Sequence, residues 1–421
     1  MPPAISARLN AHDGSYWEPA EAESRAPLAA VSASPIALTI YDDLAAIEHD
    51  WRAFEQHADC TVFQTYEWLS TWQRHIGERD HVRPAIVVGR DGHGGIVFML
   101  PLATRATGFA RELTWLGSEL CDYNAPLLAE SFSRHVDAEQ FKQLWRSIIE
   151  WLQIQPRLRF DLVRFEKMPA TIGAQPNPML ALGVTLNPSG AYATPLGESW
   201  DAFYAAKRSA NTRRRDRTKR NRLAEFGEIK LVTPDSESGV TETLSVLMAQ
   251  KALAFARMGV ANLFARPGYV DFYRAIATDP STRHLVHVSR LEVGSQAAAA
   301  NIGLTFRGTY YHLQASYTDG ELARFGPGAA HLHDLLRYAI EHGFKTYDFT
   351  IGDERYKLDW CDGAQPLYDH IAVATWRGAL VVAPVIAMQK LKRRIKQTPW
   401  LWNSFSKGRA LIGALLSPAG K

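Results

Sequence analysis

The chain has 421 residues and a formal net charge of +3, from 47 Lys and Arg against 44 Asp and Glu. Hydrophobic residues make up 46% and charged residues 22%, the composition of a globular protein with packed cores. These values exclude a fibrous repeat, a disulfide scaffold and a mainly disordered chain. The near-neutral charge argues against a dedicated nucleic-acid coat protein.

The ends of the chain and its cysteines bear on its compartment. Residues 1–35 are rich in Ala, Pro, Ser and Glu and lack the apolar segment of a signal peptide, so we expect a disordered leader. The cysteines, Cys60, Cys121 and Cys361, are too few and too widely spaced for a disulfide framework or a zinc site. The apolar run over 379–388 is about half the length of a membrane-spanning helix. We therefore expect a cytoplasmic protein that holds no metal.

Apolar periodicity predicts an alternation of helices and strands in the first half of the chain. Helical spacing occurs over 42–54, 65–76 and 139–152. Strands are predicted over 85–88, 96–102, 112–116 and 159–165. The first two of these strands flank a Gly-rich turn and form a β-hairpin. A stretch rich in Pro, Gly and Asn over 169–195 then interrupts the pattern, as a linker or a crossing strand.

The second half repeats this order of elements. Helices are predicted over 200–206, 243–257, 271–278 and 328–342. Strands are predicted over 285–291, 298–306, 309–317, 346–350 and 371–376. The repeated order predicts an α+β fold of two tandem modules, each a mixed, mostly antiparallel sheet flanked by helices. We expect the modules to span 36–190 and 191–380, before a basic amphipathic tail over 381–421.

A dense cluster of cations opens the second half. Residues 207–222 hold nine Lys and Arg side chains, Arg213 among them, and a single acid, Asp216. The segment fits a solvated helix face. It also fits an anion site for the phosphates of a bulky cofactor or for an acidic acceptor, because guanidinium groups bind phosphate in a bidentate manner. Nucleic-acid binding is a third interpretation, although no aromatic residues interleave the cations.

A glycine-containing turn leads into the helix predicted over 328–342. Residues 323–330 read Ala-Arg-Phe-Gly-Pro-Gly-Ala-Ala and follow a strand. Small residues at this position let backbone N–H groups approach an anion such as a pyrophosphate. A proline in the first helical turn is also a routine helix start, so the pattern fits either interpretation.

The block 347–360 at the end of a strand holds the densest set of polar residues in the chain. Its carboxylates can act as general bases: Asp348, Asp353 and Glu354. Tyr356 can donate a proton, and Lys357 can stabilise developing negative charge. A loop held by ion pairs and Asp–backbone hydrogen bonds is the alternative interpretation.

Histidines elsewhere give weaker signals. His312 and Gln314 are two residues apart on the strand 309–317, which places them on one face. His312 fits a base, but a packed, hydrogen-bonded residue is the favoured interpretation. His331 and His333 face different directions on a helix and do not make a metal pair. Common hydrolase and nucleotide-hydrolysing motifs are absent from the sequence.

Several motifs occur in register with one another. They are Phe-Gly-Pro-Gly at 325–328, Glu-His-Gly at 341–343, the polar run at 348–357, Thr-Val-Phe-Gln-Thr-Tyr-Glu-Trp at 61–68 and Met-Leu-Pro-Leu at 99–102. Together with the arginine-rich stretch that ends in Glu-Phe-Gly, they resemble the CelD/BcsL-like (BioF-like) acetyltransferases of the GNAT superfamily. The resemblance covers about 36–376.

The resemblance implies two tandem GNAT-like folds, as in the related Fem-type peptidoglycan aminoacyltransferases. It implies acyl transfer from acyl-CoA, with acetyl-CoA as the foremost donor, to an amine or hydroxyl of a small-molecule or saccharide acceptor. The setting that it implies is exopolysaccharide or cell-envelope biosynthesis, and DNA is not expected as a partner. By position, the loop that cradles the CoA pyrophosphate corresponds to Arg324, Phe325, Gly326, Gly328 and Ala329. Pro327 departs from the usual Gln/Arg-x-x-Gly-x-Gly/Ala pattern of that loop.

These considerations give a hypothesis for the site. The acceptor attacks the thioester directly in the cleft between the modules, since no cysteine sits in a nucleophile setting. The candidate catalytic residues are Asp348, Glu354, Tyr356, Lys357 and His312. The candidate substrate-binding residues are Gln314, Asp353, Trp360 and Arg213.

Two rival functions remain. A Fem-type transferase would take its group from an aminoacyl-tRNA, with the arginine cluster in contact with the tRNA. A non-catalytic partner of a polysaccharide-synthesis complex would touch an acidic membrane surface with the basic tail. The cations of that tail are Lys390, Lys392, Arg393, Arg394 and Lys396.

Overall fold

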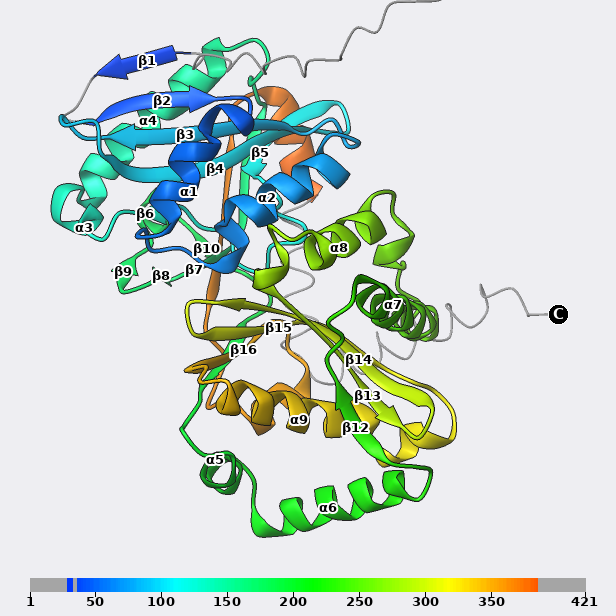
Figure 1. Ribbon diagram of the computed structural model, residues 1–421. Coiled ribbons are helices and arrows are strands. Elements are labelled where there is room, and N and C mark those ends of the chain that lie inside the picture. The colour runs from blue at the N-terminus through cyan, green and yellow to red at the C-terminus, as the bar shows by residue number, and fades with distance from the viewer. Residues whose placement is uncertain (1–28, 33–35, 385–421) are drawn as a thin grey trace, which may run out of the picture.

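The structure is a computed structural model of the 421-residue chain, and it describes residues 29–32 and 36–384. Two mixed β-sheets, one above the other in Figure 1, form the centres of two modules, and helices cover both faces of each sheet. This arrangement confirms the α+β class and the two modules predicted from the sequence.

The N-terminal module is built on a nine-stranded sheet. Eight strands lie in the order β1 (Ala29–Ser32), β2 (Ala37–Tyr41), β3 (Arg83–Arg90), β4 (Ile96–Thr107), β5 (Ala110–Trp115), β7 (Leu162–Pro169), β17 (Leu367–Val373) and β10 (Thr185–Leu186). The short β6 (Leu127–Leu128) pairs with β4, and β8 (Thr171–Ile172) and β9 (Gln175–Pro176) form a separate hairpin.

Helices pack on the two faces of this sheet according to the alternation of side chains along its strands. Helices α1 (Glu48–Glu55) and α2 (Tyr66–Trp72) bury Trp51 and Trp68 in one core, with Val88 of β3. Helix α4 (Ala138–Ile154) buries Phe141 in a second core, with Val87 of the same strand. The short α3 (Phe132–His135) precedes α4.

The C-terminal module is built on a six-stranded sheet. Its strands lie in the order β11 (Ala191–Pro195), β16 (Thr346–Ile351), β15 (Thr309–Tyr317), β14 (Gln296–Phe306), β13 (Val286–Val293) and β12 (Ile229–Val232). Its helices are α5 (Trp200–Lys207), α6 (Ala210–Ala224), α7 (Glu237–Met258), α8 (Tyr269–Thr278) and α9 (Pro327–Glu341). Helices α7 and α8 cover one face of the sheet and α9 covers the other, with α6 beside α9 (Figure 1).

The two sheets repeat one topology. In the N-terminal sheet β2, β3, β4, β5 and β7 are successive neighbours, and in the C-terminal sheet β12, β13, β14, β15 and β16 are. The last pair of each series is parallel, with Leu113 opposite Val163 and Tyr310 opposite Tyr347. In both modules a helix, α4 or α9, connects the strands of the parallel pair.

One strand of the N-terminal sheet comes from beyond the C-terminal module. β11, at the start of the 191–380 module, pairs antiparallel with β16 of its own module. β17 follows the C-terminal module but pairs antiparallel with β7, with Ala372 opposite Val163. The prediction that the strand near 371–376 completes the 191–380 module is therefore wrong, because the backbone of β17 bonds to the free edge of β7 instead.

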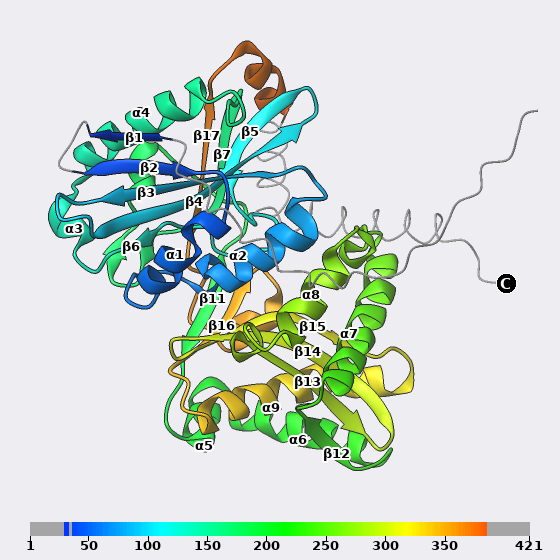
Figure 2. The same ribbon diagram turned by 45° about the horizontal axis from the view of Figure 1, so that its top comes forward.

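The module junction shares a hydrophobic core. Helix α2 lies beside α8 (Figure 2), and Trp68 of α2 packs edge to face on Phe272 of α8, with ring centroids 4.9 Å apart. The same core contains side chains of α1, α2, α7 and α8. Such continuous apolar packing fixes the position of one sheet relative to the other.

The ends of the chain differ in part from the expectation. Ala29–Ser32, assigned to a disordered leader, forms β1 and pairs with β2. The remainder of that leader up to 35 and the cations of the basic tail lie outside the described residues. Among the residues that the structure does describe, no helix is long and apolar enough to cross a membrane.

Candidate functional site

Strand β15 carries an extra residue that opens the C-terminal sheet. Tyr311 and Gln314 of β15, three residues apart, face Leu304 and Ile302 of β14, two residues apart. A β-bulge of this kind bends the strand and increases its twist. The pairing of β15 with β16 that the structure describes runs from Thr309 to Tyr311, and beyond Tyr311 the two strands separate.

A cavity of about 380 Å³ lies where the two strands part, and we call it the strand-gap pocket. Its walls come from β15, from the first half of α9 and from the segment after β16. Predicted site residues that line it are His312, Gly326, Gly328, Ala329, Tyr356 and Trp360.

His312 and Tyr356 are the titratable residues of the predicted catalytic set in this pocket. The Nδ1 of His312 lies 2.9 Å from the Tyr347 hydroxyl, and burial lowers the pKa of His312 to about 3, so the ring is neutral. Burial raises the pKa of Tyr356, so its hydroxyl stays protonated. Tyr356 can therefore donate a proton into the pocket, whereas the hydrogen bond to Tyr347 gives His312 a packed role.

Gln314 lies on the other face of the sheet from His312. Its side chain hydrogen-bonds Tyr273 of α8, whereas His312 bonds Tyr347, which packs with α9. The prediction that His312 and Gln314 share a face is wrong, because the bulge adds one residue between them and breaks the two-residue alternation.

Asp348 faces the N-terminal module, opposite to its neighbours Tyr347 and Phe349, which pack with α9. Its Oδ1 accepts hydrogen bonds of 2.7 Å from the Tyr123 hydroxyl and from the Thr350 backbone N–H. Burial raises the pKa of Asp348 to about 7, although these hydrogen bonds act to lower it. A carboxyl with this pKa can accept and release a proton near neutral pH.

The sequence analysis missed Asp122, whose charge acts on Asp348, and Lys251, whose neighbours include Asp122. Asp122 hydrogen-bonds Thr350, and burial raises its pKa. Burial lowers the pKa of Lys251 on α7, while the charge of Glu354 acts to raise it.

A sequence signal for Lys251 was available. It follows Leu244 and Leu247, both buried residues of α7, at the spacing of a single helix face. A lysine on the apolar face of a helix is unusual unless it serves a polar site. Asp122 lies in an irregular segment between β5 and β6, where periodicity gives no such signal.

Other residues of the polar block stabilise the loop after β16. Lys357 is 3% exposed, and its Nζ donates to the Ile351 carbonyl at 2.9 Å and pairs with Glu354 at 3.0 Å. The Asp353 carboxylate accepts from the Gly190 backbone N–H at 3.2 Å, next to β11. These contacts fit the loop interpretation for Lys357 and Asp353.

The turn before α9 keeps its backbone accessible. Gly326 has φ +69°, a left-handed conformation that favours glycine, and no side chain caps the helix there. A Cβ on Gly328 would lie 3.0 Å from the Tyr317 ring. Arg324 differs from the rest of the predicted loop, because it pairs with Glu321 at 2.7 Å and is absent from the linings of the described pockets.

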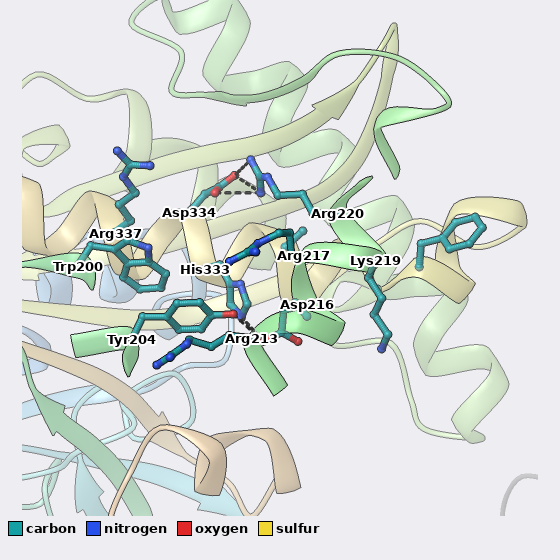
Figure 3. Close-up of a pocket in the computed structure, with 14 residues that line it drawn as sticks. Trp200, Tyr204, Arg213, Asp216, Arg217, Lys219, Arg220, His333, Asp334 and Arg337 are labelled. Carbon is teal, nitrogen blue, oxygen red and sulfur yellow. Dashed lines mark hydrogen bonds and ion pairs between the residues drawn. The ribbon is translucent and has the colours of Figure 1, made fainter. Parts of the chain in front are cut away.

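A second cavity, of about 240 Å³, lies on the other side of the α9 N-terminus, and we call it the arginine pocket. Figure 3 shows the side chains of α5, α6 and α9 that surround it. Cations in its lining are Arg213, Arg217, Lys219, Arg220 and Arg337. The two pockets share Asp216, Gly326, Ala329 and His333 in their linings, so they are contiguous along the first turns of α9.

The N-terminal module lacks the corresponding anion site at its helix. Asp137 caps α4, its carboxylate accepting the Gln140 backbone N–H at 2.8 Å in a capping box. A carboxylate at that place occupies the N–H groups and repels a phosphate. Of these two corresponding helices, α9 of the C-terminal module is the one whose start no side chain caps.

Comparisons with known proteins give a family match within the C-terminal module. Residues 210–358 match the family Acetyltransf_6, described as an acetyltransferase (GNAT) domain. Comparison with curated protein sequences gives no match. The chain is similar to the crystal structure of FemX, with a TM-score of 0.52 and 12% identity over 77% of this chain and 96% of that one.

Two further solved structures are similar at lower scores. L-PGS from Bacillus licheniformis gives a TM-score of 0.47 and 12% identity, over 82% of this chain and 96% of that one. A tandem GNAT protein from the clavulanic acid biosynthesis pathway gives a TM-score of 0.40 and 13% identity, over 80% of this chain and 98% of that one. The narrower resemblance to CelD/BcsL-like proteins stays a prediction. Residues 210–358 are thus similar to a GNAT-type acetyltransferase domain, in a chain whose fold is similar to that of FemX.

Proposed function

We propose that this protein transfers an acyl group from acyl-CoA to an amine or hydroxyl of a small-molecule or saccharide acceptor. Acetyl is the acyl group that we propose first. The observation that carries the proposal is the gap between β15 and β16, with a neutral, proton-donating Tyr356 in its pocket. Exopolysaccharide or cell-envelope biosynthesis is the setting that the sequence motifs favour for this reaction.

The residues fit an acyl-CoA on both sides of the α9 N-terminus. The uncapped turn at Gly326 and the cations of the arginine pocket would hold the phosphates. The strand-gap pocket would hold the arm and the thioester. Its shared lining with the arginine pocket lets one ligand occupy both.

The transfer itself requires one base and one acid. The acceptor atom attacks the thioester carbonyl carbon from the face on which Asp348 lies, and Asp348 takes the acceptor proton. The carbon–sulfur bond breaks, and Tyr356 protonates the departing thiolate. Burial raises the pKa of all three thiols, Cys60, Cys121 and Cys361, to about 12, so direct transfer is favoured over a cysteine intermediate.

Calorimetric titration and thermal unfolding with acetyl-CoA and longer acyl-CoAs test the proposal. A ligand that binds the native state raises the stability of that state, by about 2.7 kcal/mol at a ligand concentration of 100 times Kd. The melting temperature should therefore rise as acyl-CoA is added. The variant Tyr356→Phe should bind acetyl-CoA as tightly and turn it over more slowly. If no acyl-CoA binds, the proposal is wrong.

An aminoacyl-tRNA-dependent transferase is the second candidate. It is favoured by the exposed cations of α6, since Arg214, Arg217 and Lys219 form no ion pair within the described chain. Two results would show that the donor is an aminoacyl-tRNA and not acyl-CoA. They are an affinity for tRNA that falls steeply with salt, and turnover of an aminoacyl-tRNA by the protein.

A further inference from the structure

Lys251 of α7 has no polar partner within the described part of the chain. Helix α7 lies on the face of the C-terminal sheet that is turned towards the N-terminal module (Figure 1). The ammonium of Lys251 forms no hydrogen bond or ion pair with any described residue, and its cation–π contact is with the Phe255 ring, 5.7 Å from the centroid. The side chain is half-buried, and burial is the largest influence on its pKa. A cation withdrawn from water in this way is stabilised by an anion that a ligand brings.

Thr350 joins two carboxylates, one of which, Asp122, acts by its charge on Lys251. The Thr350 backbone N–H donates to the Asp348 Oδ1 at 2.7 Å, and its hydroxyl donates to Asp122. Thr350 has φ +59°, a left-handed conformation that a β-branched residue rarely adopts. Backbone strain of this kind persists where the surrounding structure needs a group in one position. Here the strained residue holds a carboxylate from each module in one place.

The charge of Asp122 has no cation of its own among the residues that the structure describes. The lysines whose charges act on it bond elsewhere: Lys167 donates to a backbone carbonyl, and Lys357 pairs with another carboxylate at 3.0 Å. The charge of Asp122 acts to raise the pKa of Asp348, as a like charge does. An ammonium beside both carboxylates relieves this repulsion, whereas a hydroxyl does not. The cluster therefore suits one cation at its carboxylates and one anion at Lys251.

We infer that the acceptor carries both an amine and a carboxylate, as an amino acid, the end of a peptide or an amino-sugar acid does. The inference rests on the proposed function and narrows its acceptor. The ammonium of the acceptor lies beside Asp122 and Asp348, and the carboxylate of the acceptor pairs with Lys251.

The protons of the transfer balance for an acceptor of this kind. The bound ammonium loses one proton to Asp348, and that proton leaves to solvent. The neutral amine then forms the carbon–nitrogen bond and gives its second proton to Asp348. The carbon–sulfur bond breaks, and Tyr356 protonates the thiolate and regains a proton from Asp348 through solvent. The products are the amide, free CoA and one released proton.

Matched acceptors test the inference on the unaltered protein. The standard amino acids and muramic acid are each compared with their carboxamides as acceptors for acetyl-CoA, with release of CoA as the measure of turnover. The kcat/KM of the carboxylate form should be at least about tenfold higher, because the carboxamide lacks the charge that pairs with Lys251. The matching α-hydroxy acids, which lack the ammonium, should be poorer acceptors than the amino acids by at least about tenfold.

A set of lysine variants locates the preference. Lys251→Met keeps an apolar side chain and removes the charge, so KM for the carboxylate acceptors should rise about tenfold or more with kcat little altered. Lys251→Arg keeps the charge and should retain the preference for the carboxylate form. The control Lys230→Met removes an exposed cation of β12 that pairs with Glu228 at 2.8 Å, and it should behave as the parent.

The outcomes separate this inference from the proposed function. Equal kcat/KM for carboxylate and carboxamide overturns the inference and leaves acyl transfer intact. Acetyl-CoA binding without acetylation of any carboxylate-bearing amine also overturns it, as does a preference that survives in Lys251→Met. Failure to bind any acyl-CoA overturns the proposed function together with the inference. The comparison of acceptors uses the unaltered protein, so it decides the matter even where a variant fails to fold.

Discussion

At the scale of single residues, Asp348 has two properties that the sequence could not provide together. Its position after a strand in a polar block predicted a candidate base. Its partner Tyr123 lies 225 residues away in the other module, and that contact forms only when the modules pack. Burial at this junction raises the pKa of Asp348 to about 7, which is the property that makes it suitable as a base.

Replacing Asp348 with Asn should separate activity from stability. Asn keeps an oxygen for the Tyr123 hydroxyl and the Thr350 N–H, but it accepts no proton, so turnover should fall at least about 100-fold. In the parent protein kcat/KM should rise with pH through about 7 and then level off, since the ionised carboxylate is the base. The variant should lose this rise. Steady-state kinetics from pH 5 to about 9 measures both effects.

The substitution Asp348→Asn that lowers turnover should also raise the stability of the protein. A carboxyl whose pKa is raised on folding binds its proton more tightly in the native state, so the parent loses stability between about pH 4 and 7. At pH 8 Asp348→Asn should therefore unfold with a free energy roughly 1–3 kcal/mol above that of the parent. Asp362→Asn, which alters a nearby exposed carboxylate, should change neither quantity. A destabilised Asp348→Asn would contradict this account.

At the scale of elements, periodicity predicted most of the helices and strands that carry the candidate site. The strand 309–317 was predicted with the bounds that β15 has, and the helix and strand that follow it lie within one residue of α9 and β16. The bulge in β15 was not predicted. A strand pattern of period two does not reveal an extra residue, because the bulge is defined by the partner residues on β14. The error in the face of Gln314 follows directly from this.

The turn at Gly326 gives a prediction at this scale. A Cβ there adds strain at positive φ and meets only the Ala329 Cβ, at 3.9 Å, so it extends into the lining of the two pockets. Gly326→Ala should cost about 1 kcal/mol of stability and weaken acetyl-CoA binding several-fold. Thermal unfolding and calorimetric titration measure the two effects.

The other end of α9 supplies a matched control. Gly343 has φ +75° and open space around it, far along the helix from the pockets. Gly343→Ala should show a similar loss of stability, because the backbone strain is the same, with unchanged affinity for acetyl-CoA. Equal affinities for the two variants would show that the turn at Gly326 does not contact the ligand.

At the scale of the whole molecule, the exchanged strand β17 makes the N-terminal module depend on the end of the chain. The repeat of elements was predictable, since each module carries its own hydrophobic pattern. The exchange was not, because the strand β17 could satisfy either sheet edge by its pattern alone, and its partner β7 lies about 200 residues earlier. The shared core around Trp68 and Phe272 adds to this dependence.

A truncation tests whether the exchange stabilises the N-terminal module. A chain that ends at residue 362 lacks β17 and exposes the edge of β7, an unpaired row of backbone groups. Amide hydrogen exchange followed by mass spectrometry should then show β7 losing protection, and the N-terminal module should melt several degrees lower, although the deleted segment follows the C-terminal module in sequence. A chain that ends at residue 384 keeps β17 and should retain the protection of the full chain. If β7 stays protected in the shorter chain, the N-terminal sheet is stable without its exchanged strand, and the modules are independent folding units.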